Sequence, residues 1–199
     1  MRAAVSRLGF KTVRTLAMAL VTRQLAGNNA SRQALADKLW LHSALVAVLA
    51  QVVARHIHQD PEAAMFAGLI HELGGFYLIS RADDFPGLLD ENFTEWIEYG
   101  EIEIGRAVLN KLSLPGDIVA AIEGYWYGYM SMPPTSLADT ILIAEALAPV
   151  PSPLHHFVEQ NRNSDLPSRF DMEIDEETLT GILLESAEEI RSLTEALKF

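Results

Sequence analysis

The amino-acid sequence predicts an all-α protein that folds as a compact bundle of several helices. Apolar residues recur every three or four positions along most of the chain, which places them on one face of a helix. Alternation with a period of two, typical of a half-buried strand, is not sustained in the sequence, and we find no internal repeat. With 199 residues and a hydrophobic fraction of 49%, the chain can form one domain with a substantial core.

The first two expected helices cover residues 5–25 and 34–58, and the polar stretch 27–32 separates them. Each helix carries a row of apolar residues at helical spacing. The rows include Leu8, Leu16 and Leu20 in the first helix, and Leu45, Val46, Leu49, Val52 and Val53 in the second. His56 falls near the end of the second helix, where a cation is favourable because of the helix dipole.

The third expected helix begins at Pro61, because Asp60 can cap it and Glu62 places an acid in its first turn. We expect this helix to end near Gly74 and Gly75 or shortly beyond. A connection should then cover residues 81–93. The later helices are expected from Thr94 to Leu112, from Pro115 to Tyr127, from Ser136 to Leu147 and, after the proline-rich turn "APVPSP", from Asp175 onward.

The charge of the chain narrows the classes of function. Lys and Arg number 15 against 27 Asp and Glu, which gives a formal net charge of −12. Nucleic acids and anionic membrane surfaces attract clustered cations, so we expect neither as a partner. The chain has no cysteine, which excludes disulfides and thiolate chemistry, and no uninterrupted apolar stretch reaches about 18 residues. We therefore expect a cytoplasmic protein.

Four ionisable residues fall inside stretches that are otherwise apolar. His42 shares a helix face with the apolar residues three, four and seven positions further on, so its imidazole should point into the core. His71 and Glu72 interrupt the run "AMFAGLIHELGGFYLIS", and Glu145 interrupts "TILIAEALA". Such groups are rarely buried unless they are paired or bind a metal. These four residues are therefore the candidate functional site.

The sequence resembles the HD-related output domain (HDOD), a signalling relative of the HD-domain metal-dependent phosphohydrolases. The resemblance covers roughly residues 4–149, and its most specific part is "AGLIHELG" with "WLHS" upstream. The matching blocks, in the order of the family, are "AVSRLGFKTV", "LWLHSALVAVLAQVVA", "DPEAAMFAGLIHELGGFYLI", "EIEIGRAVLNKLSLPGDIVAAI" and "LADTILIAEALA". This resemblance implies an HD-domain-like helical bundle with a signalling or regulatory role in bacteria.

The resemblance also implies a role for the four residues. HD-superfamily enzymes hold one or two divalent metals with a histidine, an adjacent His-Asp pair and a later aspartate, and the metal activates water against a phosphate ester. His42 and His71 match the histidines, Glu72 stands at the paired aspartate, and Glu145 falls at or near the last one. Both acids are thus one methylene longer than in the family, and residues 121–130 lack the histidines found in hydrolytic relatives.

Three interpretations follow from this pattern. Metal–ligand distances tolerate changes of only about 0.2 Å, so the longer acids favour a site without metal. The histidines and carboxylates would then hydrogen-bond to one another, with no catalytic residue and no cofactor, and the chain would act through protein–protein interaction. Alternatively, His42, His71, Glu72 and Glu145 hold a divalent metal such as Mn, Fe or Mg. The chain would then be a phosphohydrolase or phosphodiesterase acting on a nucleotide or cyclic dinucleotide.

The third interpretation is a ligand sensor that uses the aromatic run "YWYGYM", residues 125–130, to stack a nucleotide. The structural alternative is that Trp126 packs in the core while tyrosine hydroxyls reach the rim. We favour the structural alternative, because large aromatic side chains are the main contributors to apolar cores.

For domain organisation we expect an HDOD-like helical domain over residues 1–150 and a C-terminal helical extension, 151–199, packed on it. Family members usually carry further helices ahead of the "SRLG" block, so the domain is expected to be shortened at its N-terminus. The apolar surface left open would favour self-association. The predicted partners are therefore signalling proteins and further copies of the chain, and neither nucleic acid nor membrane.

Overall fold

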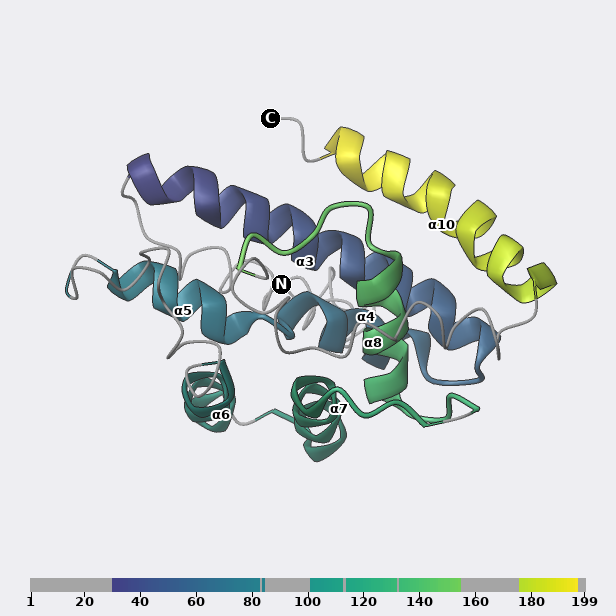
Figure 1. Ribbon diagram of the computed structural model, residues 1–199, viewed down its shortest axis with the longest axis horizontal. Coiled ribbons are helices and arrows are strands. Elements are labelled where there is room, and N and C mark those ends of the chain that lie inside the picture. The colour runs from purple at the N-terminus through teal and green to yellow at the C-terminus, as the bar shows by residue number, and fades with distance from the viewer. Residues whose placement is uncertain are drawn as a thin grey trace, which may run out of the picture.

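The computed structural model describes residues 30–82, 84, 101–112, 114–131, 133–154 and 176–196, and over these residues it is all-α, as predicted. The helix expected at 5–25, most of the connection 81–93 and the cap at Thr94 lie outside the described residues. The described helices are α3 (Ala30–His56), α4 (Pro61–Ile70), α5 (Leu73–Arg81), α6 (Glu101–Lys111), α7 (Gly116–Tyr127), α8 (Leu137–Leu147) and α10 (Glu176–Ala196) (Figure 1).

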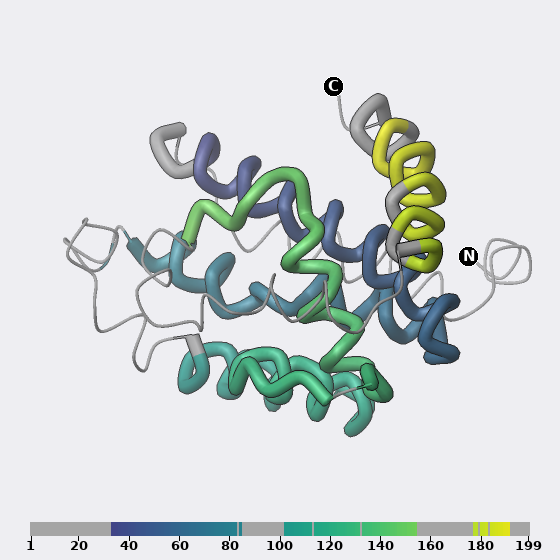
Figure 2. The backbone as a smooth tube through the Cα atoms, turned by 45° about the vertical axis from the view of Figure 1, so that its right-hand side comes forward, coloured from purple at the N-terminus to yellow at the C-terminus, as the bar shows by residue number. Residues whose placement is uncertain are grey.

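The long helix α3 is the central element, and it packs against α4, α5, α8 and α10 (Figure 1). Helices α6 and α7 lie on the opposite side of the molecule from α10 in both views (Figures 1 and 2). The main core forms where α3, α4, α7 and α8 meet. It contains Val46, Leu49, Phe66, Ile70, Ile122, Tyr125 and Ile141, all with less than 3% of their surface exposed.

Helix α4 begins as the sequence predicts. The carboxylate of Asp60 accepts hydrogen bonds from the backbone N–H groups of Glu62 at 2.9 Å and Ala63 at 3.2 Å, and Pro61 occupies the first helical turn. Further along, Gly68 allows α4 to approach α3 closely, because a Cβ at this position would lie 3.0 Å from the Cα of Ala47. The close approach brings the end of α4 to the face of α3 that carries the candidate site.

The predicted end of this helix near Gly74 and Gly75 is wrong. Helix α4 ends at Ile70, Glu72 leaves the helical conformation with φ −102° and ψ 26°, and a new helix, α5, includes both glycines. The close packing of Leu154 explains a glycine at position 75, because a Cβ on Gly75 would lie 2.4 Å from the Cδ1 atom of Leu154. The break therefore falls at His71 and Glu72, within the candidate site.

Helix α8 starts at a capping box formed by Ser136 and Asp139. The Ser136 hydroxyl accepts from the backbone N–H of Asp139, and the Asp139 carboxylate accepts from the backbone N–H of Ser136. The same carboxylate accepts further hydrogen bonds from Ser131 and Thr135. Burial alone would raise the pKa of Asp139, but these donors lower it below its usual value. The start of the helix that carries Glu145 is thereby fixed.

Two described segments, Gln33–His56 and Pro61–Arg81, are long and apolar enough to cross a membrane by length and composition alone. In the folded chain, however, 72% and 78% of their most apolar windows are buried inside the molecule. They also carry His42, His71 and Glu72 in their interior. This burial is the pattern of core helices in a globular domain.

Candidate functional site

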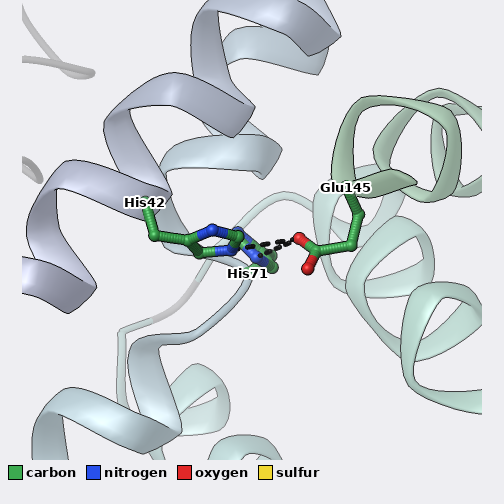
Figure 3. A group of neighbouring side chains, drawn as sticks. All are labelled: His42, His71 and Glu145. Atoms are coloured by element: carbon green, nitrogen blue, oxygen red, sulfur yellow. Dashed lines mark hydrogen bonds and ion pairs between the residues drawn. The ribbon is translucent and has the colours of Figure 1, made fainter. Parts of the chain in front are cut away.

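The structure brings the four predicted residues together from three separate elements. His42 lies in α3, His71 at the end of α4 and Glu145 in the last turn of α8, and their side chains point toward one another (Figure 3). Oε2 of Glu145 lies 3.1 Å from Nε2 of His42 and 3.4 Å from Nε2 of His71. Nε2 of His42 also lies 3.8 Å from Oε2 of Glu72. We call this group the histidine–carboxylate cluster.

The cluster is closed by the chain that follows α8, residues 148–154, which we call the closing segment. The carbonyl oxygen of Val150 lies 2.8 Å from Nδ1 of His42. The hydroxyl of Ser152 donates to Oε1 of Glu72 at 2.6 Å, and the same hydroxyl accepts from the backbone N–H of Leu154 at 3.2 Å. Leu154 in turn packs in an apolar group with Leu39, Phe76 and Ile79. The segment is thus attached both to the cluster and to the core.

Burial in the cluster is nearly complete. The side chains of His42 and His71 are fully covered, that of Glu72 is 3% exposed and that of Glu145 is 13% exposed. The ring of Tyr125, also fully buried, meets the ring of His71 edge-to-face at a centroid distance of 5.0 Å. The polar groups of the cluster are therefore surrounded by protein and depend on one another for hydrogen bonding.

Backbone carbonyls fix the tautomer of both histidines. Nδ1 of His42 faces Val150 O at 2.8 Å and Nδ1 of His71 faces Gly68 O at 2.6 Å. Because a carbonyl oxygen only accepts hydrogen bonds, each Nδ1 must carry a proton. In the neutral ring, Nε2 then presents a lone pair to the Glu145 carboxylate. The contacts at Nε2 become attractive only when a proton or a cation lies between nitrogen and oxygen.

For His42 the proton is strongly favoured. Burial alone would lower its pKa, but the hydrogen bond to Glu145, the charges of Glu72 and Glu145 and the Val150 carbonyl together raise the pKa from 6.5 to about 9. The imidazole of His42 is therefore protonated at neutral pH and donates to Glu145. The resulting group is a buried ion pair of His42 with Glu145, with the second carboxylate, Glu72, held by Ser152.

A divalent cation is the other way to satisfy these groups, and the donor set fits one ion. Nε2 of His42, Nε2 of His71 and one carboxylate oxygen of Glu145 lie within 4.8 Å of one another. Adjacent ligands of an ion at about 2.1 Å are themselves about 3.0–3.4 Å apart, which matches the two His–Glu145 distances. Donation of Nδ1–H to a backbone carbonyl is also the usual outer contact of a metal-binding histidine.

Glu72, the fourth predicted ligand, stands beside this group of three donors: its Oε1 accepts from Ser152, and its Oε2 lies 3.8 Å from Nε2 of His42. Within the described part of the chain, a second group of donors suited to a two-metal centre is not present. His42, His71 and Glu145 would hold a single ion. Bound there, the ion would supply Lewis-acid polarisation of water or of a phosphate oxygen.

Sequence reasoning missed the contributions of Val150 and Ser152. Both were assigned to a proline-rich turn, yet they follow Glu145 by only five and seven residues. A short proline-rich segment after a helix that ends in a site residue has few paths available, so proximity was a usable signal for Ser152. The contribution of Val150 comes from its backbone and has no side-chain signal.

The aromatic run is divided by the structure. Tyr125 and Trp126 are buried, which confirms the core packing expected for Trp126, whereas Tyr127 and Tyr129 are 58% and 83% exposed. Tyr127 accepts a hydrogen bond from Arg106 at 3.3 Å. Only Tyr125 reaches the histidine–carboxylate cluster, through the ring of His71.

The described helices form an all-α bundle around a buried cluster of two histidines and two acids. A crystal structure of a presumed metal-dependent phosphohydrolase from Shewanella amazonensis SB2B has a similar fold, with a TM-score of 0.71. It is 20% identical in sequence, and the alignment covers 96% of this chain and 71% of the other. The HDOD domain family matches residues 1–126, and the chain belongs to this family. No curated protein matches the sequence.

Proposed function

We propose that this HDOD domain is a regulatory module of bacterial signal transduction that does not hydrolyse phosphate esters and acts through a protein partner. One observation supports this proposal above the others. The histidine–carboxylate cluster is closed by its own chain, with Val150 O on His42 and the Ser152 hydroxyl on Glu72. A hydrolytic site needs an open position where a phosphate ester can reach the activated water.

In this proposal the cluster serves as a polar lock in the core. It ties α3 to α8 and to the closing segment through His42, and it ties Glu72, at the junction of α4 and α5, to the closing segment through Ser152. Removing one partner of such a group leaves an uncompensated buried charge, which is strongly destabilising. The lock therefore supports a rigid helical surface for a partner.

The second candidate is the metal-dependent phosphohydrolase acting on a nucleotide or cyclic dinucleotide. Two observations favour it: the three donors of His42, His71 and Glu145 fit one ion, and the similar crystal structure carries the description of a metal-dependent phosphohydrolase. The two candidates make opposite predictions for a purified protein supplied with metal.

The test uses the full chain, freed of metal with a chelator and then supplied with Mn²⁺. Before chelation, we expect elemental analysis of the purified chain to find less than one metal ion per chain. After Mn²⁺ is supplied, we expect the wild-type chain to hydrolyse bis(p-nitrophenyl) phosphate and a cyclic dinucleotide no faster than the His71→Ala variant does. Stoichiometric metal, together with turnover that His71→Ala abolishes, would reject the proposal and establish the second candidate.

A further inference from the structure

Helix α10 packs on the bundle through a small apolar group around Ile182, and its partly buried Ile190 packs against the main core. Among the described helices its principal neighbour is α3, and it lies along the outer side of α3 (Figures 1 and 2). The contact centres on Ile182, which is 1% exposed and packs in a small apolar group with Val52, Val53 and Ile143. Leu184, two residues further along α10, is 71% exposed and faces away from α3.

Charges flank the apolar contact on one side. Arg55 at the end of α3 pairs with Glu185 and, at 3.2 Å, with Glu189, and Nε2 of His56 lies 3.4 Å from Glu185 Oε2. The side chains of Arg55, Glu185 and Glu189 are each more than a third exposed, at 37%, 39% and 36%. Ion pairs this exposed contribute roughly 0–1 kcal/mol each to the free energy of binding. They therefore contribute more to the choice of partner than to the strength of binding.

The surface under α10 therefore has a definite chemical character. It offers a buried aliphatic patch of Val52, Val53 and Ile143 next to the basic residues Arg55 and His56 in the last turn of α3. It receives from α10 an aliphatic residue followed by carboxylates three and seven positions later, at Glu185 and Glu189. In a chain with a net charge of −12, a basic site that accepts acidic side chains is a distinctive feature.

We propose that this surface of α3 is an exchangeable docking site for an acidic amphipathic helix of a protein partner, and that α10 occupies it in cis. This inference rests on the proposed function, because it names the surface through which the module would act. Because α10 is tethered to the same chain, its effective concentration at the site is in the millimolar range. A partner helix therefore binds only if its affinity is high enough to displace α10, or after α10 has dissociated from the site.

The probe is a fluorescein-labelled synthetic peptide with the sequence of residues 176–196, and the receptor is the full chain. Wild-type chain should bind it weakly, because its own α10 competes. A chain whose α10 carries Glu185→Arg and Glu189→Arg, which Arg55 repels, should bind the peptide at least tenfold more tightly. A chain carrying Ile182→Asp serves as a second released variant, and circular dichroism checks that each variant is folded.

Matched peptides test which face of the helix is used. The peptide with Ile182→Asp should lose binding to the released chain, whereas the peptide with Leu184→Asp should bind within about threefold of the unmodified peptide, because Leu184 faces away. Arg55→Glu in the Ile182→Asp chain should weaken binding at least tenfold. A peptide carrying Glu185→Arg and Glu189→Arg should restore it.

Three results would overturn the inference: no peptide binding by a folded released chain, equal losses for the two aspartate peptides, or no effect of Arg55→Glu. Dimers of the wild-type chain that depend on Ile182, detected by light scattering, would also overturn it, because the occupant would then be a second copy. The readout is binding alone. Phosphate-ester turnover would reject the proposed function without changing the result for the docking site.

Discussion

At the scale of single residues, the protonation of His42 is strongly coupled to folding. Its pKa is about 9 in the folded chain and near 6.5 when unfolded, because Glu145 and Glu72 stabilise the imidazolium. A raised folded pKa stabilises the fold fully below pH 6.5, and this contribution is lost as the pH rises through 9.

We therefore expect the free energy of unfolding to fall between pH 6.5 and 9, by up to roughly 3 kcal/mol from this group. Urea denaturation at several pH values measures the slope. The His42→Gln variant, which cannot titrate, should lose most of it, whereas His58→Gln, a change at an exposed residue, should keep the wild-type slope. Equal slopes in wild type and His42→Gln would show that the cluster does not hold this proton.

Ser152 gives a second prediction at this scale. Its hydroxyl donates to the buried Glu72 carboxylate at 2.6 Å, so Ser152→Ala should reduce the free energy of unfolding by about 1–3 kcal/mol. The control is Ser80→Ala, which removes an equally short hydrogen bond, to the carbonyl of Tyr77, outside the buried core. The control should change stability by less than about 0.5 kcal/mol. A loss as small for Ser152→Ala as for the control would mean that the closing segment does not stabilise the cluster.

The sequence indicated well which side chains meet at this site, but it indicated poorly which groups form hydrogen bonds with them. His42, His71 and Glu145 stand out because an ionisable group inside an apolar helix must find a partner. The position of Glu72 could not be predicted, because it depends on the break between α4 and α5 and on Ser152. Both are consequences of tertiary packing rather than of local pattern.

At the scale of elements, the helix that begins after Asp60 was predicted correctly at its start and not at its end. Asp60 caps α4 as the sequence indicates, because a cap is a local hydrogen bond between neighbouring residues. Gly74 and Gly75 indicate a stop in the sequence, but they lie in α5. At Gly75 the absent side chain makes room for Leu154, which is distant in the sequence.

This packing gives a prediction for α5. Gly75→Ala should reduce the free energy of unfolding by about 1–3 kcal/mol, because the new Cβ would overlap Leu154. Gly116→Ala is the matched control: nothing lies within 4 Å of its Cβ position at the start of α7, so this substitution should be neutral or stabilising.

Chemical denaturation of both variants, and of Gly75→Ala made in a Leu154→Ala background, measures the coupling. If the overlap is the cause, Gly75→Ala should cost at least about 1 kcal/mol less in that background. Identical costs in the two backgrounds would assign the effect to something other than Leu154.

At the scale of the whole molecule, the net charge of −12 sets which macromolecules can approach. We expect no binding of a labelled 20-base-pair DNA duplex, or of vesicles rich in anionic lipid, at protein concentrations up to about 10 µM in 0.1 M salt. Fluorescence polarisation and vesicle sedimentation measure the two. Salt-dependent binding of either would reveal a basic surface that the overall charge conceals.

The helices of the molecule differ in how extensively they are packed. The core of α3, α4, α7 and α8 is held by extensive apolar burial and by the histidine–carboxylate cluster, whereas α10 contributes Ile182 to a smaller apolar group and the partly buried Ile190 to the edge of the main core. Segments with few buried contacts open more readily than the core. Hydrogen exchange is therefore expected to be faster in α10 than in the middle of α3.

The contact from Val150 to His42 is made by a main-chain oxygen, which every amino acid provides. Any residue that lets the chain follow the same path can therefore hold the imidazole in its required tautomer. Evolution is free to vary the side chain at this position while the chemical role persists. A comparison of related sequences would record a variable position at one of the points on which the protonation of the core depends.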